Sequence, residues 1–317
     1  MKITKEKFQN TSRWIKRNAR PLESALWSYH FEDRNDEGVI KCIEAFQNED
    51  GGFGHGIEPD FWSPYSSPMA SWAAGQILME IEAKPELKVV QKLVNYLEHS
   101  YIHENKMWPS VMTSNNEYPH APWWHWTENI QDNWAYNPSA ELAGFLLHWS
   151  PSGSSAAEIG WKTVKNAIAY LMEVDEMDRH EINNFQQLVK LMSKQESEFD
   201  SRLNYPLKET AEKVNALAYK AAGKNKSVWA EGYVATPLDF AEQPEDSLSM
   251  RFGTSIDDNL DFYIEQLSNE GTWDIPWSWG QYENEFQVAS NHWKGILTVK
   301  RYKILDSFGR LDVKYMR

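Results

Sequence analysis

Apolar residues recur every three or four positions along most of this chain, the spacing that places them on one face of an α-helix. In Lys84–Ser100, for example, Leu87, Val90, Leu93 and Leu97 follow this spacing. The same pattern predicts helices over Ser12–Tyr29, Gly38–Phe46, Pro68–Ile81, Pro138–Trp149, Ala156–Val174, His180–Lys194, Thr210–Ala222, Ile256–Leu267 and Phe286–Leu305. Alternating patterns typical of strands are scarce, so the sequence predicts an all-α fold.

The predicted helices are of two kinds. Pro68–Ile81 and Pro138–Trp149 are small and apolar on nearly every face, whereas Lys84–Ser100 and Trp161–Glu173 carry charges on one side. A helix that is apolar all round is buried by its neighbours, and an amphipathic helix lies at the surface. We therefore expect inner and outer helices to alternate in layered pairs, in a ring or a solenoid.

Two long segments outside the predicted helices, Met107–Asn137 and Trp273–Phe286, are rich in aromatic residues. Long loops in a compact domain are usually functional or disordered, and such aromatic content argues against disorder. No low-complexity linker divides the chain, so the sequence predicts a single domain over residues 1–317.

Composition narrows the class of ligand. The 41% hydrophobic fraction is enough for a sizeable core, and sixteen tryptophans are more than a core needs, so some of them are expected to line a groove or cavity. The net charge of -14 disfavours nucleic acid and anionic membranes, because binding to phosphates relies on Lys and Arg. We expect a small-molecule or lipid-like ligand as the partner, whereas the oligomeric state does not follow from the sequence.

Cysteine content and hydropathy point to a cytoplasmic protein. The single cysteine, Cys42, excludes a disulfide framework and a site built from several cysteines. No run of about 18 apolar residues predicts a membrane span. The opening residues, MKITKEKFQN, lack the apolar centre of a signal peptide.

A glycine-rich stretch, QNEDGGFGHGIEPD, covers Gln47–Asp60. Its first part is similar to a stretch near the other end of the chain. Each of the two stretches ends a predicted helix, makes a turn and places an aromatic residue two positions after a glycine; they are Phe46–Phe53 and Leu267–Trp273. Such internal similarity between units that contain a helix indicates a repeat architecture.

These features resemble the repeat of the α/α-toroid superfamily, which includes squalene and terpenoid cyclases and protein prenyltransferase β-subunits. The matching pieces span most of the chain and are QNEDGGFGHGIEPD, SSPMASWAAGQIL, NPSAELAGFLL and WKGILTVKRYKILDSFGRL. More narrowly, the chain resembles bacterial proteins described as prenyltransferase-like or terpenoid-cyclase-like. The resemblance implies an α/α toroid, a barrel of inner and outer helices around a central cavity, and it leaves the reaction open.

Most of the glycine-rich stretch is expected to be structural. Gly51, Gly52 and Gly54 permit positive φ angles and close approach of the backbone at a turn that ends a helix. Gln47 can donate to carbonyl groups at that helix end. Ser67 can cap the following helix, with Pro68 in its first position.

The three residues His55, Glu58 and Asp60 follow this turn and are not needed for it. In the toroids that the chain resembles, loops that enter inner helices border the central cavity. A histidine and two carboxylates at that place could transfer protons or bind a cation. They could equally bond loop amides or cap the next helix, and the sequence leaves both interpretations open.

The signatures of known reactions in this superfamily are absent or incomplete. Prenyltransferases hold zinc with Asp, Cys and His, but Cys42 lies on an apolar helix face, as a core residue does. The DxDD motif of protonating cyclases lacks its first Asp in Ser255–Asp261, where first-turn carboxylates after a capping Ser255 would offset the helix dipole. The same segment matches the DDxxD metal motif literally, so a divalent metal stays open; no other cofactor is predicted.

Aromatic side chains accompanied by carboxylates can stabilise a carbocation or stack on sugar rings. The candidate ligand-binding residues are Trp62, Trp123, Trp124, Trp126, Trp134, Trp273, Trp277, Trp279, Glu128 and Glu283. Alternatively, each tryptophan fills the interior of the fold. His120 and His125 lie five residues apart in a proline-containing loop, a poor spacing for metal ligands, so no metal site is predicted from them.

Glu141 is a further catalytic candidate because it lies one turn into an otherwise apolar helix, which Asn137 is expected to cap and Pro138 to begin. A buried acid needs a partner, either an arginine or an amide. It could also face the cavity, at a position equivalent to the segment His55–Asp60 in a neighbouring repeat.

Three functions follow from these residues. The first is a terpenoid-cyclase-like or prenyltransferase-like enzyme, a transferase or lyase, that acts on an apolar or isoprenoid substrate. The second is a carbohydrate-active α/α-toroid enzyme that pairs Glu58 or Asp60 with Glu141 or Glu128. The third is a binding protein that has kept the toroid without the chemistry, since fold alone does not determine function.

Overall fold

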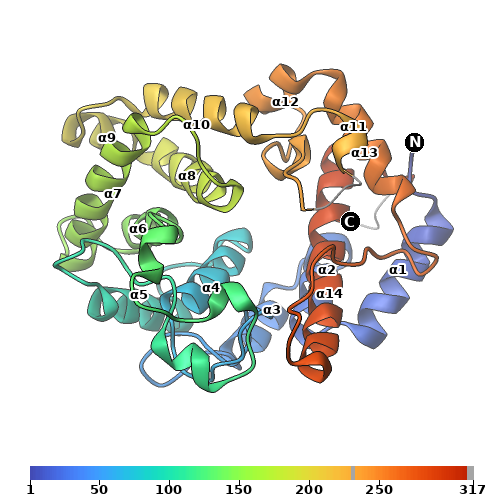
Figure 1. Ribbon diagram of the computed structural model, residues 1–317, viewed down its shortest axis with the longest axis horizontal. Coiled ribbons are helices and arrows are strands. Elements are labelled where there is room, and N and C mark those ends of the chain that lie inside the picture. Colours follow the sequence, from blue (N-terminus) through green and yellow to red (C-terminus); the bar gives the residue numbers. More distant parts are fainter. Residues whose placement is uncertain (230–232, 313–317) are drawn as a thin grey trace. The chain divides into compact units, whose positions relative to one another are not determined.

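Figure 1 shows the computed structural model of the chain, which describes residues 1–229 and 233–312. The described residues form α-helices, short 3-10 helices, turns and isolated bridges, and none of them belongs to a β-strand. The predicted all-α class is therefore confirmed.

The chain divides into two compact units. Unit 1 combines Met1–Ala45 with Ala222–Arg317, and unit 2 is Phe46–Ala221. Each unit has a core of its own, with Trp27 and Tyr302 buried in unit 1 and Phe145 and Phe185 buried in unit 2. The single domain expected over residues 1–317 stays a prediction.

Unit 2 is built from two rows of helices. The helices are α4 (Pro68–Glu80), α5 (Lys88–Ser100), α6 (Ser139–Trp149), α7 (Ser155–Glu173), α8 (Arg179–Met192), α9 (Glu196–Arg202) and α10 (Leu207–Ala221). One row holds α4, α6 and α8, and the other holds α5, α7 and α10 (Figure 1). Short 3-10 helices cover Thr113–Glu117, Pro122–Trp124, Ile130–Asn133 and Ser193–Gln195.

The sequence pattern explains which helix belongs to which row. Every residue of α6 except His148 is buried, because α5, α7, α8 and α4 surround it. By contrast, α5 buries Val89, Val90, Leu93, Tyr96 and Leu97 and exposes its charged positions, as an amphipathic outer helix does. The predicted alternation of inner and outer helices is found within unit 2.

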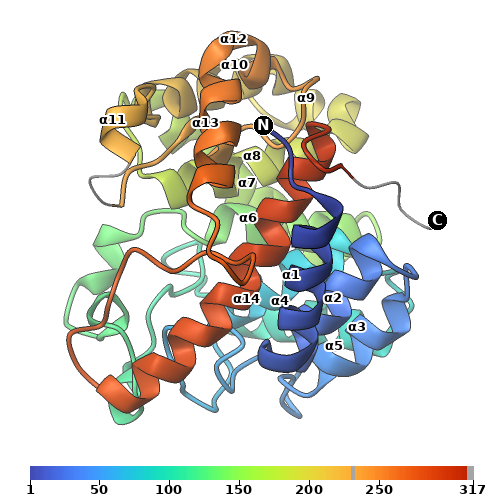
Figure 2. The ribbon, with the colours of Figure 1, turned by 90° about the vertical axis from the view of Figure 1, so that its right-hand side faces the viewer.

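Unit 1 contains the two ends of the described chain. Its helices are α1 (Lys5–Asn18), α2 (Pro21–Phe31), α3 (Asp36–Glu44), α11 (Lys226–Trp229), α12 (Ser247–Phe252), α13 (Thr254–Glu265) and α14 (Glu283–Ser307), with a 3-10 turn at Pro237–Asp239. Figure 2 shows α1 and α14 side by side, and α2 packs against both. The Trp27 ring lies 5.2 Å from the rings of both Phe8 and Tyr302, which forms an aromatic core between these helices.

Two predicted helix boundaries were wrong, both at prolines. Ser12–Tyr29 is two helices, since α1 ends at Asn18 and α2 begins at Pro21. A proline disfavours the helical conformation in the preceding residue, and Arg20 is extended with ψ of 155°. Similarly, Pro85 lies in a turn before α5, which begins at Lys88 and not at Lys84.

The two similar glycine turns have the same hydrogen bonds. In unit 2, Asn48 N–H donates to the Gly52 carbonyl at 2.9 Å and Gly51 N–H to the Asn48 carbonyl at 3.0 Å. In unit 1, Ser268 N–H donates to the Thr272 carbonyl, also at 2.9 Å, and Gly271 N–H donates to the Ser268 carbonyl at 3.0 Å. The φ angles of Gly51 and Gly271 are 93° and 84°. The internal similarity expected from the sequence is therefore structural.

Of the other structural roles expected near this turn, the cap of the following helix is present, whereas Gln47 has a different role. Ser67 Oγ accepts from Ala70 N–H at 3.0 Å and caps α4, with Pro68 in the first turn. Gln47 Nε2 donates to the carbonyls of Gly51 at 3.0 Å and Val89 at 2.9 Å. It therefore connects the turn to α5 rather than to the end of the preceding helix α3.

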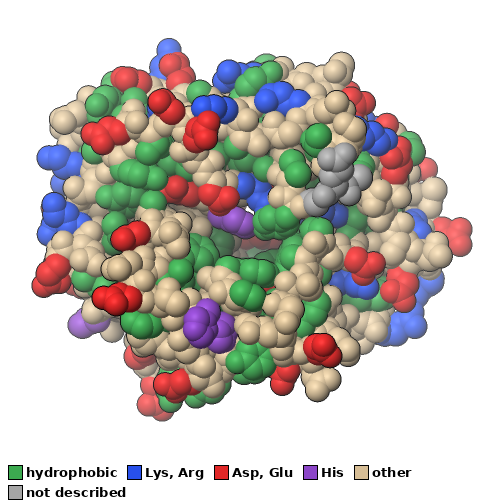
Figure 3. All heavy atoms as spheres, viewed as in Figure 1, with side chains coloured by type: hydrophobic (Ala, Val, Ile, Leu, Met, Phe, Trp, Pro, Cys, Tyr) green, Lys and Arg blue, Asp and Glu red, His purple; other side chains and the backbone are tan. Residues whose placement is uncertain are grey.

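Charged side chains of both signs are interspersed over the face shown in Figure 3. Among the described helices, none is both long enough and apolar enough to cross a lipid bilayer. The predicted absence of a membrane-spanning helix is thus confirmed for residues 1–229 and 233–312. A cytoplasmic location and the absence of nucleic-acid binding stay predictions.

Candidate functional site

Glu141 is buried in unit 2 and held by side chains of a neighbouring helix. It is the third residue of α6 and is 2% exposed. Its Oε2 atom accepts from Trp72 Nε1 at 2.6 Å and from Gln76 Nε2 at 3.1 Å, and its Oε1 accepts from Gln76 at 3.3 Å. Indole and amide donors on α4 therefore orient this carboxyl group.

The start of α6 is fixed by polar contacts with the preceding loop. Ser139 Oγ accepts from Trp108 N–H at 3.0 Å, and Ser110 Oγ donates to the Asn137 carbonyl at 2.6 Å. The position before the helix is occupied by Pro138, so the expected cap at Asn137 was wrong by one residue. Asn137 Oδ1 instead accepts from Asn184 Nδ2 at 3.1 Å.

The three candidates in the segment after the glycine turn have different surroundings. His55 is exposed, has φ of 57°, and places Nε2 2.9 Å from Asn48 Oδ1. Glu58 and Asp60 are buried, and Glu58 Oε2 accepts from Asp60 N–H at 2.9 Å. The two acids share an interior position that the histidine does not, so His55 is the weakest of the three candidates.

This segment packs against the aromatic loop of the same unit. Trp62 N–H donates to the Pro119 carbonyl at 2.9 Å, and its indole N–H donates to the Pro59 carbonyl at 2.9 Å. The adjacent Phe61 ring lies 5.1 Å from Trp124, which in turn stacks on Trp134 at 4.6 Å and 13°. The tertiary structure thus packs the segment that contains Glu58, Asp60 and Trp62 against the loop that contains Trp124 and Trp134.

The remaining candidates of this loop lie at its surface. Trp123 and Glu128 are exposed, and Trp126 is half-buried. The Asn116 side chain bonds both backbone polar groups of Trp126, because its Oδ1 accepts from Trp126 N–H at 2.7 Å and its Nδ2 donates to the Trp126 carbonyl at 3.0 Å.

His120 and His125 are close together despite their separation in sequence. Their rings stack with centroids 5.2 Å apart, and His120 Nε2 lies 3.0 Å from His125 Nδ1, so one ring donates to the other. Across the described residues, no group of three or more His, Cys, Asp or Glu side chains is arranged to hold a metal ion.

The aromatic candidates near the end of the chain belong to unit 1. Trp273 is 1% exposed and donates from Nε1 to the Tyr263 carbonyl at 2.8 Å, so it packs in the core of that unit. Trp279 is also buried, whereas Trp277 is half-buried with its ring at 81° to Trp293 and a centroid distance of 5.3 Å. Glu283 is exposed at the first residue of α14.

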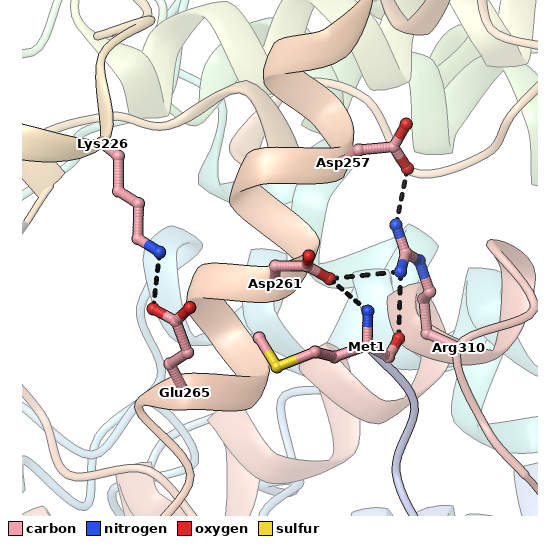
Figure 4. Close-up of polar contacts among 6 residues, drawn as sticks. All are labelled: Met1, Lys226, Asp257, Asp261, Glu265 and Arg310. Carbon is pink, nitrogen blue, oxygen red and sulfur yellow. Dashed lines mark hydrogen bonds and ion pairs between the residues drawn. The ribbon is translucent and has the colours of Figure 1, made fainter.

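Figure 4 shows the surroundings of the DDxxD-like segment on α13. Arg310 binds both of its outer acids, with Nη2 2.6 Å from Asp257 and Nη1 3.1 Å from Asp261. The amino group of Met1 is 2.7 Å from Asp261. Positive groups therefore contact both outer acids of this segment. The expected cap at Ser255 was wrong, since α13 begins at Thr254.

Sequence reasoning missed Glu181, which is the third residue of α8 and 7% exposed. Its Oε1 accepts from Tyr136 N–H at 3.1 Å, and its Oε2 is 3.5 Å from the Tyr170 hydroxyl. Burial, with a smaller effect of the nearby Asp178 carboxylate, raises the pKa of Glu181 to about 7 even though these two donors lower it. A signal was present, because Glu141 also occupies the third position of its helix.

The Glu141 and Glu181 carboxyls point in different directions although their helices are neighbours. Glu141 is bonded to side chains of α4, and Glu181 to the segment before α6 and to the end of α7. They therefore form two separate polar clusters in unit 2.

No protein-family model, curated protein or solved structure matches the chain.

Proposed function

We propose that this chain is an α/α-toroid enzyme similar to terpenoid cyclases and prenyltransferases, and that it acts on an apolar, isoprenoid-like substrate that bears or develops positive charge beside Glu141. The observation that carries the proposal is the Glu141 carboxyl group, which is buried in an apolar helix and oriented by the uncharged donors Trp72 and Gln76. The repeated glycine turn and the two helix rows of unit 2 support the toroid.

The chemistry follows from the electrostatics of this cluster. Hydrogen bonds from neutral donors favour the ionised form of a carboxyl group and fix its direction. A positive centre near that carboxylate and near the face of the Trp72 indole would be stabilised by both. Because Trp72 and Gln76 are half-buried, the cluster lies beneath side chains that also reach the surface of unit 2.

The proposal does not include ionisation of a diphosphate at Asp257 and Asp261. Arg310 neutralises both acids, and a divalent cation there would have to displace the guanidinium group. The charge-stabilising role is therefore assigned to unit 2, and the expected substrate class is an isoprenoid without a diphosphate group.

A pair of ligands that differ in charge tests the proposal. One is an isoprenoid tertiary amine, which is protonated at neutral pH, and the other is the isoprenoid alcohol of the same chain length. We expect calorimetry to show the amine bound about tenfold or more tightly than the alcohol, as a charge-assisted contact of about 1.5–3 kcal/mol requires. Glu141→Gln should remove this preference while the alcohol still binds.

Two control variants make the result specific. Glu209→Gln changes an exposed acid in the first turn of α10, and Glu181→Gln changes the buried acid of the second polar cluster, so both should keep the preference. An amine preference that survives in Glu141→Gln would contradict the proposal. Stabilisation of the native protein by oligosaccharides alone would favour the carbohydrate-active alternative.

A further inference from the structure

We infer that Glu181, Asn184, Tyr136 and Tyr170 form a second binding site in unit 2, separate from Glu141, and that this site takes a primary ammonium group. The site is built on one face of α8 against the segment before α6. Glu181 bonds Tyr136 N–H at 3.1 Å, and Asn184, one turn later, bonds Asn137 at 3.1 Å. Side chains three positions apart on a helix have Cβ atoms about 5–6 Å apart, so the two polar groups are neighbours.

An amide oxygen at this place lacks a donor. Asn184 is 0% exposed, and its Nδ2 donates to both Asn137 Oδ1 and the His180 carbonyl. Its Oδ1 atom is buried without a hydrogen-bond partner among the described residues. Because both contacts of the Nδ2 group are acceptors, exchanging the amide nitrogen and oxygen would break both bonds. A buried acceptor left in this state is energetically unfavourable, and a donor from a ligand would offset this cost.

The Glu181 carboxyl group also has acceptor capacity to spare. An ionised carboxylate has about four lone-pair sites. One of these sites accepts the hydrogen bond from Tyr136 N–H. The distance of 3.5 Å between the Tyr170 hydroxyl and Glu181 Oε2 is longer than that of an ordinary O–H···O hydrogen bond. Glu181, Asn184 and the Tyr170 hydroxyl together offer three acceptors, which matches the three N–H donors of a primary ammonium group.

Two aromatic rings complete the recognition of a cation. Tyr136 and Tyr170 are half-buried, with ring centroids 5.3 Å apart and planes at 43°. The face of a tyrosine ring attracts an ammonium group within about 6 Å of its centroid.

Binding of the ammonium group is coupled to loss of a proton. Burial is the largest influence on the pKa of Glu181, followed by the hydrogen bonds from the Tyr136 backbone N–H and the Tyr170 hydroxyl and by the Asp178 carboxylate, and the Tyr136 hydroxyl is the further titratable group coupled to it. At neutral pH the acid is partly protonated, because its pKa is raised to about 7. An incoming ammonium ion keeps its own three protons, and the Glu181 proton leaves to solvent as the ion pair forms.

Methylammonium chloride is the probe, since it carries the ammonium group with little else. Shifts of the Tyr136 backbone amide and the Asn184 side-chain amide in a nuclear magnetic resonance titration report binding at the site. We expect saturable shifts, with affinity about tenfold higher at pH 8 than at pH 6, because the ionised fraction of a group with a pKa of about 7 rises about tenfold over that range. Potassium chloride at equal concentration should leave these signals unchanged.

Variants separate this site from the Glu141 cluster. Glu181→Gln should weaken methylammonium at pH 8 at least tenfold and remove the pH dependence, whereas the exposed Glu209→Gln should change neither. Tyr170→Phe, which keeps the ring and removes the hydroxyl, should weaken binding severalfold and serves as the test if Glu181→Gln does not fold.

Three outcomes would overturn the inference. One is the absence of saturable shifts, which would mean that the buried acceptors hold water alone. Another is equal affinity at pH 6 and pH 8 in the unaltered protein. The third is unchanged binding in Glu181→Gln. None of these outcomes bears on the isoprenoid amine preference expected at Glu141, so failure of one proposal leaves the other testable.

Discussion

At the scale of single residues, equivalent positions in the sequence have different chemistry in the folded chain. Glu141 and Glu181 are each the third residue of an inner helix, and both are buried. Glu141 receives three contacts from indole and amide donors, whereas Glu181 receives one good hydrogen bond and has a pKa raised to about 7. The side chains and segments that surround each carboxyl group, and not the residue type, separate the proposed roles.

The raised pKa of Glu181 predicts how the free energy of unfolding depends on pH. The folded protein holds this proton more tightly than the unfolded chain, where the ordinary value is 4.5. Stability from this group is therefore present below pH 4.5 and is lost as pH rises through about 7. A shift of this size corresponds to roughly 3 kcal/mol between pH 4 and pH 8.

Denaturant unfolding of the unaltered protein and of Glu181→Gln at several pH values measures this loss. The difference in unfolding free energy between the two proteins should shift by roughly 3 kcal/mol in favour of the variant as pH rises from 4 to 8. Other titrating groups cancel in this difference, including His292, whose pKa burial lowers to about 4. A pH-independent difference would show that Glu181 ionises normally in the folded state.

At the scale of elements, tight turns set how closely neighbouring segments approach. A Cβ atom added at Gly51 would lie 2.2 Å from the Lys92 carbonyl oxygen, and the φ of 93° is one that side chains other than glycine rarely adopt. The related Gly271 would place a Cβ atom 2.0 Å from Thr11 Oγ1. The two similar turns therefore need glycine both for backbone conformation and for space.

Gly51→Ala and Gly153→Ala separate these two requirements. Gly153 has φ of 77°, and no atom lies within 4 Å of its added Cβ. Gly153→Ala should therefore lower the unfolding free energy by about 1–2 kcal/mol, the conformational cost alone. Gly51→Ala should cost roughly 4 kcal/mol or more, because a backbone oxygen must also move. Similar losses in thermal and denaturant unfolding would contradict the steric part of this account.

At the scale of the whole molecule, the chain order of the two units predicts different behaviour on truncation. Unit 2 is one continuous segment, Phe46–Ala221, with its own buried core, whereas unit 1 is made of segments from both ends of the chain. A segment of this length can bury enough apolar surface to fold by itself. Either half of unit 1 alone lacks part of its core, because Trp27 packs on Tyr302.

A fragment of residues 46–221 is therefore expected to fold, and a fragment of residues 222–317 is not. Circular dichroism of the first should show a helical spectrum with a cooperative thermal transition, and the second should show little helix and no transition. The second fragment is the matched control for helical propensity, since it contains the long helix α14. A disordered 46–221 fragment would show that this unit depends on the rest of the chain.

Much of the secondary structure and the glycine turn could be predicted from the sequence. Helical spacing located the inner helices α4 and α6 to within one or two residues, and the match between Gly51 and Gly271 identified the repeated turn. Errors at Pro21 and Pro85 arose because local conformational restriction outweighed apolar spacing, and the caps expected at Asn137 and Ser255 were also misplaced. These features depend on residues a few positions apart, so they are encoded locally.

The chemistry of the acids was decided by the tertiary structure. Trp72 and Glu141 are 69 residues apart, and Tyr136 and Glu181 are 45 residues apart, yet each pair forms a hydrogen bond that determines how the acid is oriented. Burial likewise depends on which distant segments cover a side chain, and it separates Glu58 and Asp60 from the exposed His55. The sequence by itself determined the helices and turns, because their spacing is local. Only the packed chain decided which carboxyl groups left water, because desolvation is set by every neighbour at once.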